Sequence, residues 1–139
     1  KSPWSCAAFY VNKQAELEQV PRLVINYKPL NKVLQWIRYL IPNKKDVLDR
    51  HHEATIFSNF DMKSDFWQVQ IDEKDRYKTT FIVPFGHYEW NVMPFGLKNA
   101  PSEFQNIMND IFTPFTDFSI VYIDDVLIFL NQSVTIGNI

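Results

Sequence analysis

The chain has 139 residues, of which 46% are hydrophobic and 16% aromatic. This length and composition fit one globular domain with a substantial core and exclude a disordered chain. The longest apolar run is interrupted by charge, which excludes a membrane span, and the single cysteine, Cys6, excludes an internal disulfide and predicts a reducing compartment.

The formal net charge is -2, but it is unevenly distributed. Residues 1–50 carry nine Lys or Arg against four acids, whereas residues 51–139 carry five against twelve. A basic first part is suited to a phosphate backbone, and an acidic second part is suited to cations. The alternative for any single lysine is a solvated surface position.

The first half of the chain predicts short strands and one short helix. Two apolar segments, residues 4–11 and 21–27, predict a β-hairpin, and Asn43 can cap a helix that carries Val47 and Leu48 on one face. Residues 56–62 then predict a strand that ends at Asp61.

The next stretch alternates charged, apolar and turn-forming segments. Residues 71–78 predict a helix or turn, and residues 79–83 and 87–92 predict a strand pair. The breaker-rich loop 94–101 precedes a helix with Asn99 or Ser102 as its cap, Pro101 in or before its first turn, and Gln105 available for a capping box. The apolar stripe of this helix is expected to be core, and its members are Phe104, Ile107, Met108, Ile111 and Phe112.

Two adjacent carboxylates, Asp124 and Asp125, interrupt an apolar run near the end of the chain. The flanking residues 118–122 and 126–130 have strand composition, which places the acids at a hairpin tip. One interpretation is a turn that uses Asp for its geometry. The other is a site for Mg²⁺ or Mn²⁺, because two close carboxylates among aliphatic residues repel each other and attract a cation. A third carboxylate is then needed, and Asp61 is the best candidate.

Four motifs resemble, in order and spacing, those of reverse transcriptases. They are the segment 22–31, Asp61 at a strand end, the loop 94–101 with its helix, and Tyr-Ile-Asp-Asp at 122–125. The nearest subtype is that of plant pararetroviruses (caulimovirus and badnavirus relatives, including copies endogenous to plant genomes), followed by gypsy-type retrotransposons. The resemblance implies an α+β fold: right-hand polymerase fingers and a partial palm, an antiparallel sheet with packed helices, and an Asp-Asp β-hairpin.

The resemblance implies an RNA-directed DNA polymerase that transfers deoxynucleotides to a primer 3'-hydroxyl on an RNA or DNA template. Asp61, Asp124 and Asp125 would be the catalytic residues and the ligands of two Mg²⁺ or Mn²⁺ ions, with Asp125 in a supporting position. Two such ions can activate the hydroxyl and stabilise charge on the leaving pyrophosphate.

Further residues match positions of the family that contact the nucleotide or the primer–template. The nucleotide set is Arg22, Lys13, Ser64 and Phe66, and the template and primer set is Gly96, Asn99, Pro101, Gln105 and Tyr122. Phe66 matches a bulky residue that excludes the ribose 2'-hydroxyl. Core packing is the alternative for this aromatic side chain.

Some positions depart from the family pattern. Asp65 stands where a small residue is usual, the finger-tip loop at 16–21 is acidic and short, and residues 130–139 do not resemble the family. We therefore expect a fingers and palm fragment over 1–129 with a divergent tail over 130–139, inactive by itself. The alternative function is a truncated, non-catalytic remnant of a viral element or retrotransposon. An RNA-templated RNA polymerase is disfavoured by Phe66 and the loop 94–101.

Overall fold

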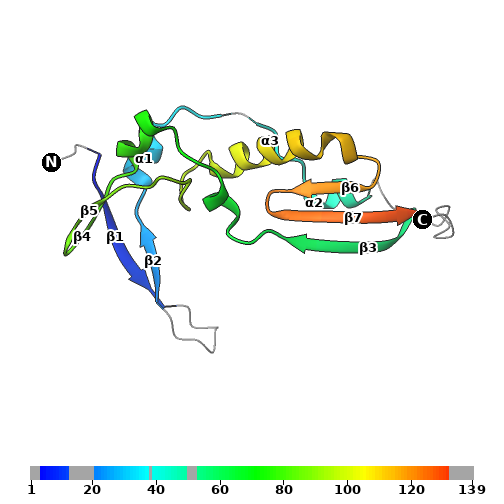
Figure 1. Cartoon of the computed structure of the whole chain (residues 1–139), viewed down its shortest axis with the longest axis horizontal. Helices are drawn as coiled ribbons and strands as arrows, with labels where there is room; N and C mark the ends of the chain where they lie inside the picture. Colours follow the sequence, from blue (N-terminus) through cyan, green and yellow to red (C-terminus); the bar gives the residue numbers. More distant parts are fainter. Residues whose placement is uncertain (1–3, 13–20, 38, 50–52, 132–139) are drawn as a thin grey trace. The chain divides into compact units, whose positions relative to one another are not determined.

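The computed structural model describes residues 4–12, 21–37, 39–49 and 53–131. It divides into two compact units, Lys1–Trp36 with Phe66–Ala100 and Ile37–Asp65 with Pro101–Ile139. Each unit therefore combines two stretches that are distant in the sequence, and each contains its own sheet (Figure 1).

The sheet of the first unit has four strands in the order β2-β1-β4-β5. These strands are β1 (Cys6–Val11), β2 (Arg22–Ile25), β4 (Phe81–Val83) and β5 (Gly86–Tyr88). The predicted hairpin of β1 and β2 is confirmed, since the two strands pair antiparallel. The expected antiparallel pairing also holds for β4 with β5, whereas β1 and β4 run parallel.

Strands β4 and β5 are shorter than the sequence predicted, and two threonines explain where β4 begins. The hydroxyl of Thr79 donates to the carbonyl of Arg76 over 2.7 Å, and that of Thr80 donates to the carbonyl of Tyr77 over 2.6 Å. Such local bonds compete with strand pairing. They extend the 3-10 helix Glu73–Thr79, so β4 starts only at Phe81.

The core of the first unit gathers around helix α1 (Lys28–Val33). Cys6, Tyr27 and Leu30 are buried together, and the Tyr27 hydroxyl donates to the carbonyl of Thr79 over 2.8 Å. The side chain of Asn31, on the same helix, donates to the carbonyl of Gly96 and accepts from the backbone N–H of Lys98. Helix α1 therefore fixes the conformation of the loop that begins at Pro94.

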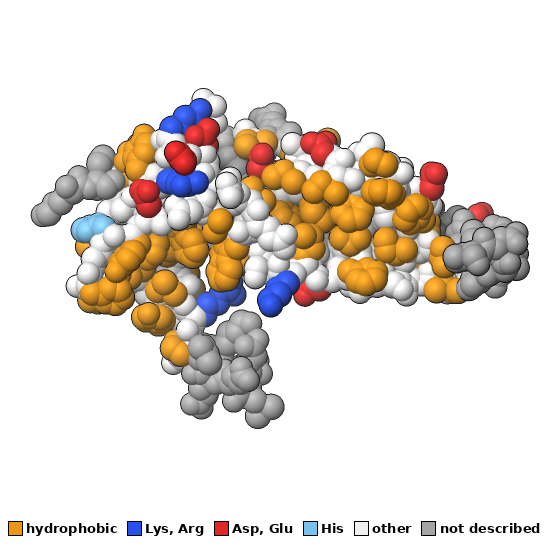
Figure 2. Space-filling model, in the orientation of Figure 1, with side chains coloured by type: hydrophobic (Ala, Val, Ile, Leu, Met, Phe, Trp, Pro, Cys, Tyr) orange, Lys and Arg blue, Asp and Glu red, His pale blue; other side chains and the backbone are white. Residues whose placement is uncertain are grey.

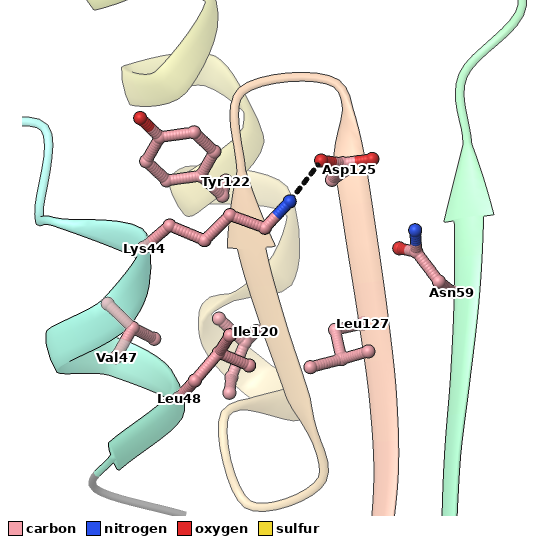
Figure 3. A pocket seen from close by; sticks show the side chains of 8 residues that line it. All are labelled: Lys44, Val47, Leu48, Asn59, Ile120, Tyr122, Asp125 and Leu127. Atoms are coloured by element: carbon pink, nitrogen blue, oxygen red, sulfur yellow. Dashed lines mark hydrogen bonds and ion pairs between the residues drawn. The ribbon is translucent and has the colours of Figure 1, made fainter.

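The sheet of the second unit has three antiparallel strands in the order β3-β7-β6. They are β3 (Ala54–Asp61), β6 (Ser119–Tyr122) and β7 (Asp125–Asn131). Helix α2 (Lys44–Asp49) lies on one side of the β6–β7 hairpin and α3 (Ala100–Phe112) lies on the other side (Figure 3). The strand predicted to end at Asp61 is confirmed.

The two helices of this unit match the sequence in part. Asn43 accepts a hydrogen bond from the backbone N–H of Lys45 over 3.0 Å, which confirms the predicted cap of α2. Ser102 lies within α3 and is not its cap. Phe104 is buried, but Ile111, in the last turn of the helix, is 56% exposed, so the prediction that the whole stripe is core was wrong.

Large apolar side chains also lie on the surface of both units (Figure 2). Examples are Tyr10 and Phe85 in the first unit and Ile56 and Phe60 in the second. No helix in the described ranges has the length and apolar character needed to cross a membrane.

Candidate active site

The acidic pair lies where β6 turns into β7. Strand β6 ends at Tyr122, β7 begins at Asp125, and these two residues are paired across the hairpin. Between them Ile123 has a φ of 55°, a left-handed conformation that is unfavourable for a β-branched side chain. The turn that carries Asp124 is therefore strained and needs support from its surroundings.

Gln105 of α3 supplies this support. Its side-chain carbonyl accepts from the backbone N–H of Ile123 over 2.6 Å, and its amide donates to the carbonyl of Val121 over 3.0 Å. The amide also donates to Asn109, whose own amide donates to the Tyr39 hydroxyl. Gln105 is fully buried. The structure therefore places a residue expected near the template, or in a capping box, directly beneath the acidic turn.

Asp61 lies opposite Asp125 on neighbouring antiparallel strands. Residues in this relation project from the same face of a sheet, with their Cβ atoms about 5 Å apart. The carbonyl of Asp124 accepts from the backbone N–H of Met62 over 3.1 Å, which ties the turn to the end of β3. Asp61 and Asp124 are 63 positions apart in the sequence, and the fold brings Asp61 to the end of the sheet that carries Asp124 and Asp125.

Lys44 provides positive charge at this acidic end. Its Nζ lies 2.9 Å from Oδ2 of Asp125 and 5.8 Å from the centre of the Tyr122 ring (Figure 3). The hydrogen bond and the charge of Asp125 raise the pKa of Lys44. Bonding to Lys44 in turn lowers the pKa of Asp125, and hydrogen bonding from Asn59 on β3 adds to this effect.

Sequence reasoning did not identify Lys44 or Asn59. Lys44 lies 81 positions from Asp125, and one lysine among fourteen Lys and Arg residues carries no local signal of its partner. The one available signal was the predicted cap at Asn43, which begins a helix at Lys44.

The donor chemistry of the three acids suits Mg²⁺ or Mn²⁺, which prefer carboxylate oxygens. In the described part of the chain, however, no three His, Cys, Asp or Glu side chains are gathered closely enough to form a ready metal cluster. Asp125 is engaged by Lys44, while Asp61 is exposed and Asp124 is half-buried. The residues fit the ion in type and in strand position, but the side chains do not converge as a preformed cage.

Two predicted nucleotide-binding residues of the first unit meet on one aromatic ring. The guanidinium of Arg22 lies 5.1 Å from the centre of the Phe95 ring, and the buried ring of Phe66 lies 5.4 Å from the same centre. Sequence analysis did not single out Phe95. The packing of Phe66 supports its core-packing interpretation and leaves its role toward a sugar a prediction.

The other predicted site residues take the following positions. Gly96 has a φ of 96°, and Ser64, an exposed residue, has a φ of 58°. The Asn99 amide donates to the carbonyl of Gln35 over 2.6 Å, and Pro101 lies in the first turn of α3. Lys13 lies outside the described residues, as does the expected tail from residue 132 onward.

The sequence matches one family model and several curated proteins. Residues 11–138 match the family described as reverse transcriptase (RNA-dependent DNA polymerase). The chain is 51% identical over 129 residues to the genome polyprotein of Petunia vein clearing virus (isolate Shepherd), which covers 92% of this chain and 6% of the polyprotein. It is 49% identical over 133 residues to the enzymatic polyprotein of Cauliflower mosaic virus (strain Strasbourg), which covers 95% and 20% respectively. The chain thus spans a fifth or less of the length of these two relatives.

Solved structures share the fold. The chain matches the protease–reverse transcriptase of Prototype Foamy Virus with a TM-score of 0.79 at 20% identity, over 92% of this chain and 17% of that one. It matches the foamy viral enzyme in complex with an RNA/DNA hybrid with a TM-score of 0.76, over 93% of this chain and 17% of that one. The α and β elements described above therefore form a mixed fold similar to that of a retroviral reverse transcriptase.

Proposed function

Because the chain belongs to the reverse transcriptase family, as its motifs indicated, we propose that it is the nucleotidyl-transfer part of an RNA-directed DNA polymerase of the pararetrovirus type. In this role it transfers deoxynucleotides to a primer 3'-hydroxyl. The partners are a primer–template of RNA or DNA and deoxynucleoside triphosphates. The foamy viral relatives solved with an RNA/DNA hybrid and with double-stranded DNA support such partners.

One observation carries the proposal: the pairing of Asp61 with Asp125 beside the turn that holds Asp124. Two like charges in directly opposed positions destabilise a sheet unless a cation lies between or beside them. A fold that brings these three acids together from distant stretches of sequence is suited to ion binding. The same three residues match the catalytic motifs of the family.

We propose that Asp61 and Asp124, supported by Asp125, hold two divalent ions. When bound, such ions lower the pKa of a hydroxyl and neutralise phosphate charge. The task of the chain is to fix the positions of the carboxylates, because phosphoryl transfer depends mainly on positioning and electrostatics. Gln105 contributes by holding the turn at Ile123 from beneath.

The remaining predicted residues take supporting roles in this proposal. Arg22 is an exposed residue, and its guanidinium can bind a triphosphate in a bidentate manner. Phe66 would limit the space beside the sugar, and Ser64 lies in the turn between Asp61 and Phe66. The loop at Gly96 and Asn99, with Pro101 and Tyr122, would approach the template and primer.

A titration of the chain with Mn²⁺, followed by thermal unfolding, tests the ion site. Binding to the folded state raises the melting temperature. At an ion concentration of about ten times Kd, the free energy of unfolding rises by about 1.4 kcal/mol. We expect Asp124→Asn to remove this shift. Asp110→Asn, an equal change of charge at an exposed position of α3, should retain it. An absent shift in the unmutated chain contradicts the proposed site.

A graft tests the activity. Residues 4–131 would replace the corresponding segment of a caulimovirus polymerase, and primer extension on an RNA template would be measured. We expect extension that Asp124→Asn abolishes. A folded graft that binds Mn²⁺ but extends no primer would favour the non-catalytic remnant, with Asp65 as the first residue to revert to a small side chain.

A further inference from the structure

Without a bound metal ion, the carboxylates at the acidic end of the three-stranded sheet repel one another. Asp61 and Asp125 occupy directly opposed positions, and Asp124 follows in the adjoining turn. Like charges in such positions repel each other. Lys44 is a cation that the structure pairs with one member of this group, Asp125.

The position of Lys44 is set by packing as well as by charge. Val47 and Leu48, one turn further along α2, line the same pocket as Ile120 and Leu127 of the hairpin (Figure 3). These apolar side chains hold α2 against the sheet on the face that carries Asp125. The lysine is therefore presented to Asp125 by a docked helix rather than by a free loop.

Tyr122 also lies beside the side chain of Lys44, which reaches Asp125. The Tyr122 residue is paired with Asp125 across the hairpin, and its ring lies beside the Lys44 side chain, with Nζ 5.8 Å from the ring centre. Figure 3 shows the lysine extended between the ring and the carboxylate. An ammonium near an aromatic face is stabilised by the ring electrons. Both hairpin residues of this pair thus contact the same ammonium.

We propose that Lys44 is a counter-cation for Asp125 in the ion-free chain, which leaves Asp61 and Asp124 as the main carboxylate ligands of the divalent ions. The inference rests on the proposed function for the ion itself, but the pairing of Lys44 with Asp125 does not. Two consequences follow. Lys44 stabilises the ion-free hairpin, and its positive charge weakens the binding of a divalent ion nearby.

The first test is a double-mutant cycle on the chain in EDTA, with the melting temperature measured by thermal unfolding. In the unmutated chain Asp125→Asn removes the partner of Lys44, so we expect a lower melting temperature. In Lys44→Gln the same change relieves repulsion from Asp61, so we expect a higher melting temperature. The change of sign supports the counter-cation, and additive effects of the two substitutions overturn it.

The second test measures Mn²⁺ binding through the electron paramagnetic resonance of the free ion. Lys44→Gln should tighten Kd by about threefold to tenfold at low salt, with a smaller effect at high salt because exposed charges are screened. Lys45→Gln, on the next residue of α2, makes the same change of charge and should alter Kd less than twofold. Lys44→Arg keeps the charge and should resemble the unmutated chain.

The outcomes separate the two proposals. Weaker Mn²⁺ binding in Lys44→Gln, or an effect equal to that of Lys45→Gln, overturns the assignment of Asp125 to Lys44. If the unmutated chain binds no Mn²⁺, the proposed ion site and the division of its ligands both fail, while the cycle in EDTA still decides the counter-cation.

Discussion

The side-chain carbonyl of Gln105 accepts a hydrogen bond from the backbone N–H of Ile123 over 2.6 Å. One buried side chain on α3 thus stabilises the strained residue that precedes Asp124. The position of the first carboxylate of the pair depends on this contact, because the turn has an unfavourable backbone conformation at Ile123.

Gln105→Met should therefore destabilise the chain. The variant keeps the length of the side chain but leaves the N–H of Ile123 and the carbonyl of Val121 without this partner, at a cost of about 1–3 kcal/mol. Urea unfolding measures this loss. Asp110→Asn on the same helix is the control, and a loss in Gln105→Met below about 0.5 kcal/mol would show that the turn does not depend on this contact.

Tyr27→Phe should lower stability in a way that depends on pH. The substitution removes the bond to the carbonyl of Thr79, which costs about 0.5–1.5 kcal/mol near neutral pH. Burial raises the pKa of Tyr27, so the folded chain keeps the tyrosine proton when the unfolded chain begins to lose it, at about pH 10. The stability that the tyrosine contributes is complete below that pH and is lost as the pH rises further.

The measurement compares unfolding of the two chains in urea at about pH 8 and about pH 10.5. We expect the stability gap between the tyrosine and phenylalanine forms to narrow at the higher pH. A constant or widening gap would contradict the assignment of a raised pKa to Tyr27.

Gly96→Ala should destabilise the loop that precedes α3. The residue has a φ of 96°, which L-amino acids with a side chain rarely adopt, so a Cβ introduces strain of roughly 1–2 kcal/mol even though the space around it is sufficient. Thermal unfolding measures the effect. Lys98→Ala in the same loop is the control, since its backbone N–H still donates to Asn31. Equal stability of Gly96→Ala and the unmutated chain would refute the strain argument.

Phe66→Val tests the proposed sugar gate. In the grafted polymerase we expect a higher ratio of ribonucleotide to deoxynucleotide incorporation, because the smaller side chain leaves room for a 2'-hydroxyl. Phe81→Val, at another buried aromatic of the first unit, should lower stability without changing this ratio. If both variants lose stability and neither changes the ratio, Phe66 is a core residue only.

Elements with a strong local pattern could be predicted from the sequence. The β1–β2 hairpin, the cap at Asn43 and the end of β3 at Asp61 follow from residue types that are adjacent in the chain. The predictions were wrong where a side chain bonds to nearby backbone, or where the burial of a residue depends on which other element packs over it. The hydroxyls of Thr79 and Thr80 bond to carbonyls of the preceding turn, so β4 begins later than predicted. Ile111 belongs to the apolar stripe of α3 by its spacing, but it is exposed.

The candidate site shows the same division. The motifs identified Asp61, Asp124 and Asp125, but the partners that position them are distant in sequence. Gln105 meets Ile123 18 positions later, and Lys44 meets Asp125 81 positions later. The parallel pairing of β1 with β4 is also non-local. Such contacts depend on the packing of whole elements, which a local pattern does not contain.

Phe95 contacts two residues to which different functions are proposed, triphosphate binding and sugar discrimination. Its ring contacts both the guanidinium of Arg22 and the ring of Phe66. If Arg22 binds the triphosphate and Phe66 limits the space beside the sugar, then nucleotide affinity and sugar discrimination both depend on the position of the Phe95 ring. Natural variation at position 95 would change both properties together, so a lineage that gained nucleotide affinity through this residue would also alter its fidelity toward ribose.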